Sequence, residues 1–554
     1  MEKIWLNSYP EGVPEKIDIG ESDTLVTLME NAFEKFADRP AFACMGKTIT
    51  FGELDSLSEA FGAWLQGQGL QPGSRIAIML PNVLQYPIVM CGALRAGLVV
   101  VNVNPLYTAR ELKHQLTDSG AEAMVVLANF ANVLEKVVAE TQVKKVVITD
   151  LGDALGFPKS LLVNTVVRHV KKLVPSYRLP GHTRYKDAMS AGGGAQLRDV
   201  LLTGDSLAFL QYTGGTTGPS KGAMLTHANI YSNILQNVAW VNQYVVTGHE
   251  IVITALPLYH IFGLVCNCLT FFLIGGLNVL ITNPRDMPGF VKEISKWPFT
   301  AIYGVNTLFN ALLQEPSFSA VDFSHLKTAA GGGMAVQSAV AEKWKSVTGH
   351  VLQEGYGLTE CSPVVSMNPR EQKDDYTGSC GLPLPSTEIS IRGDSGQELP
   401  IGERGELCIR GPQVMKGYWQ RDEATAESFH EDGFLLTGDI ATVDESGYIR
   451  IVDRAKDMVL VSGFNVYPCE IEDVVTRCDG ILEAACIGVP DEKSNEAVKI
   501  FVVREPKSEI SQDELIAYCR ENLTGYKVPR HVEFRDELPK SNVGKILRRE
   551  LRES

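Results

Sequence analysis

The stretch Tyr212-Thr-Gly-Gly-Thr-Thr-Gly-Pro-Ser-Lys-Gly222 combines hydroxyl side chains, glycines that expose the backbone, and one cation. It directly follows an apolar segment that predicts a strand. Backbone N–H groups, hydroxyls and a lysine all bind phosphate oxygens, so this segment predicts a phosphate-binding loop. It is not the P-loop of kinases and ATPases, because Lys221 lies between Ser220 and Gly222 instead of following glycine and preceding Ser or Thr. A plain flexible loop is the alternative.

Six further segments follow in order: LPLYHIFG (256–263), AAGGGM (329–334), GYGLTE (355–360), LLTGDI (435–440), VDRAKDMVLVSGFNVYP (452–468) and PKSNVGKILRREL (539–551). Taken singly, each has a plain structural explanation. His260 alone is typical of a hydrogen-bonded core histidine, and glycines 331–333 and Asp439 are typical of turns. Glu360 alone resembles a capping or surface residue, and Lys545 belongs to a basic terminal segment that water would solvate.

Together, these segments resemble the adenylate-forming superfamily of acyl-CoA synthetases, firefly luciferase and nonribosomal adenylation domains, and within it the bacterial long-chain fatty-acid–CoA ligases. The resemblance extends from IWLNSYPEGVP to the terminal LRREL. It implies ATP-dependent conversion of a fatty acid to acyl-CoA through an acyl-adenylate, with Mg²⁺ as cofactor and ATP and CoA as co-substrates. The alternatives are transfer to a carrier protein or other acceptor, a medium-chain acyl-CoA ligase, and a silent lipid-binding protein with the same fold.

In this family a carboxylate attacks the α-phosphorus of ATP, which brings two anions together and requires cations and aligned donors. The resemblance implies that the phosphate loop holds the β- and γ-phosphates, and that Mg²⁺, which prefers oxygen ligands, binds Thr213 and Glu360. It assigns catalytic positions to Lys545, Glu360 and His260, with His260 beside the acyl carboxylate. The nucleotide-binding residues that it implies are Thr213, Gly214, Gly215, Thr216, Thr217, Gly218, Lys221, Gly331, Gly332, Gly333, Tyr356, Gly357, Thr359, Asp439 and Arg454.

Within this set, Gly331–Gly333 and Tyr356 resemble the wall of the adenine pocket, and Asp439 resembles the carboxylate that binds the ribose, with Arg454 beside it. After adenylation, Lys545 must leave the site so that a thiol can enter. The resemblance implies rotation about a hinge at 453–457, with Lys456 as the pivot and Gly463 as the point where the pantetheine arm approaches. The expected domains are therefore 1–452, the hinge 453–457, and 458–554.

The elements that must position these residues follow a βαβ rhythm. Apolar strand candidates at 75–80, 99–103, 123–127 and 145–149 alternate with helix-length segments, and the rhythm resumes at 205–353. Thr108-x-x-Glu111 predicts a capping box at the start of one helix. The apolar run 251–284 lacks Asp, Glu, Lys and Arg, but Pro257, His260 and two glycines favour strand, helix, strand over a membrane helix.

After residue 370, short strands between glycines and prolines predict a small antiparallel barrel or sheet. The last hundred residues predict an α+β unit, with a helix near 470–478, strands at 484–489 and 499–503, a helix at 511–522 and a strand at 531–536. The expected fold class is therefore α/β multidomain. It has a large N-terminal domain of two parallel-sheet α/β subdomains plus a small β-barrel, followed by a small mobile α+β C-terminal domain.

The chain has 554 residues, with 51 basic and 66 acidic side chains and a net charge of −15. This length predicts more than one core, and the negative charge argues against a nucleic-acid partner. Eleven cysteines without paired spacing predict reduced thiols, and the start of the chain lacks the apolar region of a secretory signal. The sequence therefore predicts a cytoplasmic protein, and it leaves a homodimer open.

One segment is strongly basic although the whole chain is acidic. Residues 154–186 contain seven Lys or Arg and no Asp or Glu, and valines and leucines recur at helical spacing between 161 and 174. A basic amphipathic helix of this kind predicts peripheral contact with an anionic membrane surface, on the inner face of the cytoplasmic membrane. The equal alternative is that the apolar stripe packs on the protein. The apolar residues of 305–313 are expected to line the acyl pocket or, equally, to belong to the core.

Overall fold

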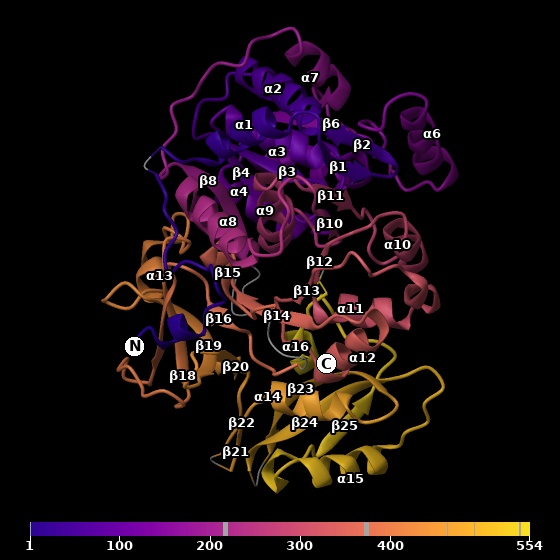
Figure 1. The fold of residues 1–554 in the computed structure, drawn as a ribbon. Coiled ribbons are helices and arrows are strands. Elements are labelled where there is room, and N and C mark those ends of the chain that lie inside the picture. Colours follow the sequence, from indigo (N-terminus) through magenta and orange to yellow (C-terminus); the bar gives the residue numbers. More distant parts are fainter. Residues whose placement is uncertain are drawn as a thin grey trace.

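The computed structural model of the chain describes residues 2–20, 22–213, 220–370, 376–462, 464–491, 494–541 and 544–553. In these residues, two large sheets, a smaller antiparallel sheet and a fourth sheet near the C-terminus account for the strands. Figure 1 shows the indigo N-terminal elements at the top, the yellow C-terminal elements at the bottom, and the orange antiparallel sheet beside the centre.

The four early strand predictions are confirmed, and their strands belong to a seven-stranded sheet in the order β7-β6-β5-β3-β4-β8-β9. All neighbours pair in parallel except β8 and β9, which are antiparallel. The predicted capping box is also confirmed, because Thr108 and Glu111 cap α4 (Ala109–Ser119). The strands are β3 (Arg75–Met79), β4 (Val99–Asn102), β5 (Ala123–Leu127), β6 (Lys145–Thr149), β7 (Thr183–Arg184), β8 (Leu207–Thr213) and β9 (Lys221–Thr226).

The second sheet has nine strands in the order β16-β15-β14-β13-β12-β10-β11-β1-β2. Its centre is parallel and its two edges are antiparallel, so the resumed βαβ rhythm is confirmed. Its strands are β1 (Pro40–Cys44), β2 (Lys47–Thr50), β10 (Ile251–Thr254), β11 (Leu277–Leu280), β12 (Ala301–Gly304), β13 (Thr328–Gly331), β14 (Leu352–Gly357), β15 (Val364–Met367) and β16 (Leu382–Pro383).

Helices lie between the two large sheets and on their outer faces. In β3, Ile76 and Ile78 join the core shared by both sheets, whereas Ala77 and Met79 join the core on the outer face. Strands buried on both faces explain the continuous apolar runs of the sequence. The shared core takes in α1 (Leu25–Phe36), α2 (Phe51–Gly67), α3 (Gln85–Arg95), α7 (Tyr185–Gly192) and α8 (His227–Val241). The outer helices are α4 and α5 (Ala131–Glu135) on one side, and α10 (Met287–Ile294), α11 (Asn306–Gln314) and α12 (Ser338–Thr348) on the other.

The apolar run 251–284 folds as expected, with a helical segment between two strands. After β10, a π-helix (Gly263–Leu269) continues into the short α9 (Thr270–Leu273), and β11 follows. This segment is buried between the sheets and contributes to the shared core. In the described residues, no helix has the length and apolarity needed to cross a membrane.

The region after residue 370 was expected to form a small antiparallel barrel or sheet, and it forms an antiparallel sheet. Its four strands pair antiparallel in the order β17-β18-β19-β20. An isolated antiparallel bridge joins Ile449, the first residue of β20, to Gly381, which directly precedes β16. This bridge connects the four-stranded sheet to the nine-stranded one. The elements are β17 (Glu388–Arg392), β18 (Gly405–Arg410), α13 (Asp422–Glu427), β19 (Leu435–Val443) and β20 (Ile449–Arg454).

The α+β pattern at the end of the chain is confirmed, and we call residues 459–553 the C-terminal unit. It has its own hydrophobic cores, separate from those of the large sheets. The position of the hinge at 453–457 stays a prediction. The elements are β21 (Val459–Val461), β22 (Phe464–Val466), α14 (Pro468–Thr476), β23 (Ile481–Asp491), β24 (Asn495–Arg504), α15 (Gln512–Asn522), β25 (His531–Phe534) and α16 (Arg548–Arg552).

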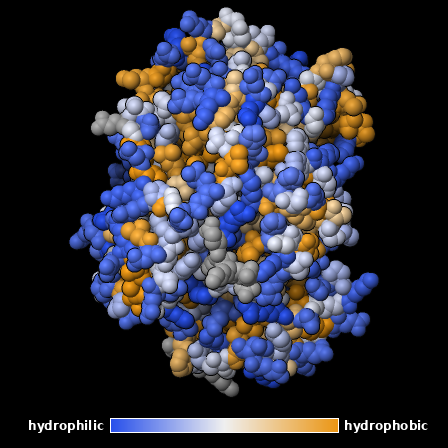
Figure 2. Space-filling model, in the orientation of Figure 1, coloured by the Kyte–Doolittle hydropathy of each residue, from blue (hydrophilic) through white to orange (hydrophobic). Residues whose placement is uncertain are grey.

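The basic segment contains α6 (Lys159–Thr165), continued by a π-helix (Val166–Val170), so its helix ends before the predicted residue 174. The predicted apolar stripe divides: Val163, Val167 and Val174 pack on the protein, as the alternative reading expected. Other large apolar side chains face outward. Figure 2 shows hydrophobic residues gathered where Figure 1 places α6. The exposed residues are Phe157, Leu161, Leu162, Val170 and Leu173.

Glycines allow three helices of the shared core to pack backbone against backbone. A Cβ added to Gly92 in α3 would lie 2.7 Å from the carbonyl oxygen of Ser58 in α2, and a Cβ on Gly62 would lie 2.8 Å from the oxygen of Gly92. A Cβ on Gly192 in α7 would lie 1.8 Å from the oxygen of Ala60. Because packed backbones cannot yield as side chains do, these positions require glycine.

We expect Gly92→Ala to lower the free energy of unfolding by about 1–3 kcal/mol, because the added methyl overpacks the α2–α3 contact. Gly67→Ala is the matched control: Gly67 also lies in α2, but nothing lies within 4 Å of its Cβ position. In a helix, that change is neutral or stabilising. Differential scanning calorimetry measures both, and equal unfolding temperatures for the two variants would contradict the packing explanation.

Candidate active site

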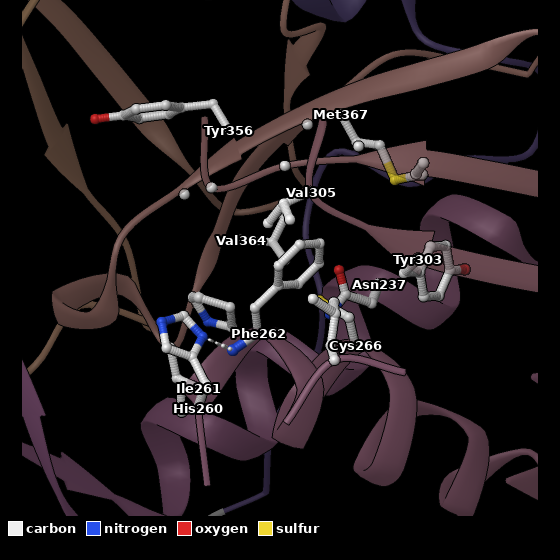
Figure 3. A pocket seen from close by; sticks show the side chains of 18 of the residues that line it. Asn237, His260, Ile261, Phe262, Cys266, Tyr303, Val305, Tyr356, Val364 and Met367 are labelled. Carbon is white, nitrogen blue, oxygen red and sulfur yellow. Dashed lines mark hydrogen bonds between the residues drawn. The ribbon is translucent and has the colours of Figure 1, made fainter. Parts of the chain in front are cut away.

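A pocket lies where the nine-stranded sheet meets the C-terminal unit, and its empty space, with the solvent at its mouth included, is about 950 Å³. Four groups of predicted site residues line it: His260, Gly331–Gly333, Tyr356–Thr359 and Lys545. Gly331–Gly333 lie at the carboxyl end of β13, and Tyr356–Thr359 lie at the carboxyl end of β14. Ligands bind at this end of parallel sheets. Figure 3 shows Tyr356 and His260 toward one side of this cavity and Tyr303 at the other.

Lys545 enters the cavity from the C-terminal unit on a fixed turn. Thr307 of α11 donates a hydrogen bond to the carbonyl oxygen of Gly544 (2.9 Å), and the backbone N–H of Ser541 donates to that of Lys545 (2.7 Å). The lysine lies against Gly333, where an added Cβ would be 3.2 Å from Cε. Glycine at position 333 therefore makes room for the incoming side chain.

The electrostatics around Lys545 are balanced. Burial and then the charge of Arg454 lower the pKa of Lys545 to about 8, while Asp439 and Glu360 act in the opposite direction. At neutral pH most of the molecules therefore carry a cation at this position. A weakly solvated ammonium is suited to meeting a negatively charged reactant.

His260 faces the cavity in its neutral form. Burial, followed by the nearby Lys545, lowers the pKa of His260 to about 3. The backbone N–H of Phe262 donates to Nδ1 of His260 (3.3 Å), which leaves Nε2 as the N–H donor of the neutral ring. His260 therefore lines the cavity beside Lys545, and the local arrangement makes it a hydrogen-bond donor that adds no charge.

Asp439 is buried and binds two predicted partners at once. Tyr356 donates its hydroxyl to one carboxylate oxygen (2.6 Å), and Nε of Arg454 lies 3.2 Å from the other. The pairing of β19 with β20 sets Asp439 directly opposite Arg454. Burial and the Asp439 charge raise the pKa of Tyr356 well above its usual value, so Tyr356 remains a donor. These three residues from three strands form one polar cluster.

Glu360 and Lys221 are connected by a residue that sequence reasoning missed. Tyr418 donates its hydroxyl to Glu360 (2.7 Å), and Nζ of Lys221 lies 4.9 Å from the centre of the Tyr418 ring. Thr213 pairs with Lys221 across β8 and β9, at the base of the phosphate loop. The loop's base therefore lies close to Glu360, as the resemblance required.

Two groups of predicted residues lie outside the described part of the chain. They are Gly214, Gly215, Thr216, Thr217 and Gly218 of the phosphate loop, and Gly463 of the pantetheine side. For the first group the structure gives the two strand ends that the loop joins, Thr213 and Lys221.

The glycines of the predicted adenine-pocket wall have close neighbours. A Cβ on Gly331 would lie 2.3 Å from Cγ2 of Val336, and one on Gly357 would lie 2.2 Å from the carbonyl oxygen of Pro363. A Cβ on Gly332 would press on the ring of Phe262, at 3.2 Å. Side chains are therefore excluded from this wall, which leaves the backbone edge open toward the cavity.

At the predicted hinge, a charged network ties 453–457 to the C-terminal unit. Arg548 lies 3.4 Å from Asp453, 3.3 Å from Asp457 and 2.7 Å from Glu472. Burial and then Arg454 lower the pKa of Lys456, whose side chain lies on a short 3₁₀ turn at Ala455–Asp457. These ion pairs tie the predicted hinge segment to α14 and α16 of the C-terminal unit.

The far part of the cavity is mainly apolar, with Asn237 and Thr270 as polar members of its wall, and it differs from the expected acyl lining. Of the segment 305–313, Val305 alone reaches the described lining, whereas Phe309 and Leu312 are buried in the core beneath the other face of the sheet. The lining comes instead from α8, the segment after β10, β12 and β15. Its members toward that end are Asn237, Val241, Cys266, Thr270, Tyr303, Val364 and Met367. Helical periodicity in 305–313 predicted a face, but not which neighbour it meets.

Several site residues carried no sequence signal. Tyr418 and Thr307 are ordinary aromatic and hydroxyl residues in the sequence, and they acquire roles through contacts with residues that lie 58 and 237 positions away.

Comparison with known proteins agrees with this arrangement. The chain matches the AMP-binding enzyme family over residues 29–419 and the AMP-binding enzyme C-terminal domain over residues 470–545. A long-chain-fatty-acid–CoA ligase of Yersinia pestis is 57% identical over 554 residues, covering 100% of this chain and 98% of the relative. A ligase of the same name from Bacillus subtilis is 37% identical over 559 residues, with the same coverage.

Among solved structures, ATP-bound MatB from Rhodopseudomonas palustris has a TM-score of 0.80 and 29% identity, covering 95% of this chain and 98% of its own. An anthranilate CoA ligase with bound anthranoyl-AMP has a TM-score of 0.86 at 24% identity, which shows the shared fold alone. The cavity at the carboxyl ends of the strands, the lysine that the C-terminal unit delivers to it, and these matches agree: the chain belongs to the AMP-binding enzyme family.

Proposed function

We propose that this chain is an ATP- and CoA-dependent ligase that converts long-chain fatty acids to acyl-CoA through an acyl-adenylate. The observation that carries the proposal is one cavity with two ends. One end holds Lys545, His260 and the predicted nucleotide-binding residues of 331–333 and 356–359, and the other end is mainly apolar. Relatives that are 56–57% identical over the whole chain bear the name long-chain-fatty-acid–CoA ligase.

In the adenylation step, a fatty-acid carboxylate approaches the α-phosphorus of ATP, and an oxygen–phosphorus bond forms as pyrophosphate leaves. Lys545 supplies the positive charge that stabilises the crowded phosphate and carboxylate oxygens. His260, neutral and donating through Nε2, holds a carboxylate oxygen by a hydrogen bond and brings no second positive charge to the site. Asp439 accepts hydrogen bonds from the ribose hydroxyls, and Arg454 and Tyr356 hold the carboxylate in place.

The residues for Mg²⁺ fit that ion. Glu360 supplies a carboxylate and Thr213 a hydroxyl, both near the phosphate-loop base, and no cluster of three or more metal-type side chains occurs among the described residues. Mg²⁺ commonly binds through one or two carboxylates together with substrate phosphates and water. When bound with ATP, the ion would neutralise phosphate charge.

In the second step, the thiol of CoA loses its proton to water and attacks the acyl-adenylate carbonyl, a carbon–sulfur bond forms, and the carbon–oxygen bond to AMP breaks as AMP leaves. Lys545 occupies the space beside Gly333 that the pantetheine arm needs, so the C-terminal unit must rotate. We propose that it turns about 453–457, with Lys456 at the pivot and Gly463 on the face that then meets the site.

We expect Lys545→Ala to reduce acyl-CoA formation from free fatty acid by about a hundredfold or more, because the transition state loses its buried cation. The same variant should convert supplied acyl-AMP and CoA within a few-fold of the wild-type rate. Pyrophosphate release and CoA-thioester formation, followed with fatty acids of several lengths, measure both steps.

Lys540→Ala is the matched control, because Lys540 lies in the same segment but pairs with Glu483 at 2.6 Å. Equal loss in both half-reactions of Lys545→Ala would contradict the proposed division of roles. Pyrophosphate release from the wild type without acylation of CoA would instead point to a carrier protein or another acceptor.

The pH dependence of adenylation follows from Lys545. Its charged form predominates below its pKa of about 8, so kcat/KM for the fatty acid should fall as pH rises through that value. In Arg454→Gln the descending limb should move to higher pH, because Arg454 helps to lower this pKa. The position of the limb is the readout, separate from any loss of rate. An unmoved limb would rule out Lys545 as the titrating group.

We further propose that the exposed apolar residues around α6, here called the α6 surface, dock on an anionic membrane. Phe157 is 88% exposed, and Leu161 and Leu162 are 63% and 65% exposed. Val170 and Leu173 of the same segment are 71% and 54% exposed, and Figure 2 shows hydrophobic residues gathered where Figure 1 places α6. Clusters of this kind mark interaction sites, because isolated exposure is common but grouped exposure is costly.

Charges beside this surface favour lipid as the partner. Lys159, Arg168 and Lys186 are bound to Met45, Asp150 and Asp153 of the protein. The remaining cations are exposed and form no ion pair with any described residue: Lys171, Lys172, Arg178 and Arg184. Basic residues next to apolar ones suit anionic headgroups and the acyl boundary beneath them.

We expect the triple variant Phe157→Ser, Leu161→Gln, Leu162→Gln to bind vesicles of phosphatidylcholine and phosphatidylglycerol at least tenfold more weakly, because three apolar insertions are lost. Leu201→Gln, which removes another exposed leucine (95%), should leave binding unchanged. Co-sedimentation measures both. Equal binding by all three proteins would remove the proposal. A concentration-dependent dimer that the triple variant abolishes would assign the surface to a second copy instead.

A further inference from the structure

A second, smaller cavity lies beyond the apolar end of the active-site cavity. Its empty volume is about 280 Å³, and it extends among α8, α9, β12 and the segment before β13. The two cavities share three lining residues, Val241, Thr270 and Tyr303, which we call the collar. The collar therefore separates the space that the acyl chain reaches from the space behind it.

Three different elements meet at the collar. Val241 is the last residue of α8, Thr270 the first of α9, and Tyr303 lies in β12; all three are more than nine-tenths buried. The Tyr303 ring packs edge-on against Phe271, with 6.1 Å between the ring centres, and Phe271 lines the second cavity. Figure 3 shows Tyr303 across the pocket from Tyr356 and His260.

Strand alternation fixes the direction of the Tyr303 side chain. Ala301 and Tyr303 belong to the core between the two large sheets, whereas Ile302 between them belongs to the core on the opposite face. Tyr303 is the largest side chain of the collar, so its ring does most to separate the cavities. Ala301 lines the second cavity but not the first, and its methyl group leaves that space open.

The second cavity suits an alkyl chain poorly while the collar is intact. Thr270 Oγ1 is buried without a hydrogen-bond partner, and a chain that passes it keeps that oxygen away from water. Farther in, Glu250 and Lys327 form an ion pair on the wall, beside Thr300 and Thr328. Val245, Phe271 and Ile274 also line this cavity and would favour methylene groups that reached it, so the Tyr303 ring that closes the passage is what ends the accessible pocket.

We infer that Tyr303 sets the upper length of the acyl chain: the methyl end of the longest well-accepted substrate rests against its ring. The inference depends on the proposed function, because it requires a fatty acyl chain in this cavity. Carbon atoms beyond that length need the second cavity, which the ring closes. Chain-length selection is thus assigned to one residue of β12.

The test is the profile of kcat/KM against chain length, measured by CoA-thioester formation with saturated acids from C8 to C24. Tyr303→Ala joins the cavities, and the ratio of the longest to the mid-length acids should rise at least tenfold. Each methylene moved from water to apolar space contributes about fourfold. Tyr303→Trp, with a larger ring, should shift the profile toward shorter acids, and Tyr303→Phe should keep the wild-type profile.

A double variant tests whether the second cavity is the space that is gained. In Tyr303→Ala with Ala301→Leu, the leucine refills that cavity, so the ratio should return toward the wild-type value. Displacement of a fluorescent fatty acid gives the same profile without turnover. Profiles of Tyr303→Ala and Tyr303→Trp that both equal the wild type, in folded proteins, would overturn the inference. Intact displacement profiles with no thioester from any acid would instead refute the proposed function and leave the length limit standing.

Discussion

The site depends on placing one ammonium group, that of Lys545, in a partly desolvated cavity that its own unit does not form. Burial and Arg454 disfavour the charge and lower its pKa to about 8, and Asp439 and Glu360 offset that cost. Those carboxylates come from the antiparallel sheet and from the turn after β14. The three sheets must therefore hold their positions for the lysine to remain a cation when the substrate arrives.

In the proposed mechanism the same arrangement must be reversible, because the lysine withdraws before a thiol enters. Contacts of the C-terminal unit with the large part of the chain include polar ones: Thr307 with Gly544, Asn310 with the carbonyl of Leu482, and Ser338 with Asp473. Water replaces such hydrogen bonds at little net cost, whereas an apolar interface would resist separation. The proposed rotation thus fits an interface that positions the unit without fixing it permanently.

Rigidity lies elsewhere, in the two parallel sheets and the helices packed between them. Glycines at 62, 92 and 192 bring helices into backbone contact, and the strands of the shared core are buried on both faces. This framework fixes the carboxyl ends of β12, β13 and β14, where Tyr303 of the collar and the glycines 331–333 and 357 lie. The proposed nucleotide site and the proposed chain-length limit are therefore built on adjacent strands of a single sheet.

The sequence by itself determined most of the parallel strands of both large sheets, the capping box at Thr108 and the family, because apolar runs, turn residues and ordered motifs are local signals. It did not determine which surfaces meet. The apolar residues of 305–313 face the core more than the acyl pocket, the stripe of 161–174 divides between inside and outside, and Tyr418 and Tyr303 had no distinguishing pattern. Periodicity specifies a shared face, whereas a pocket requires segments hundreds of residues apart to converge, and only tertiary packing decides that.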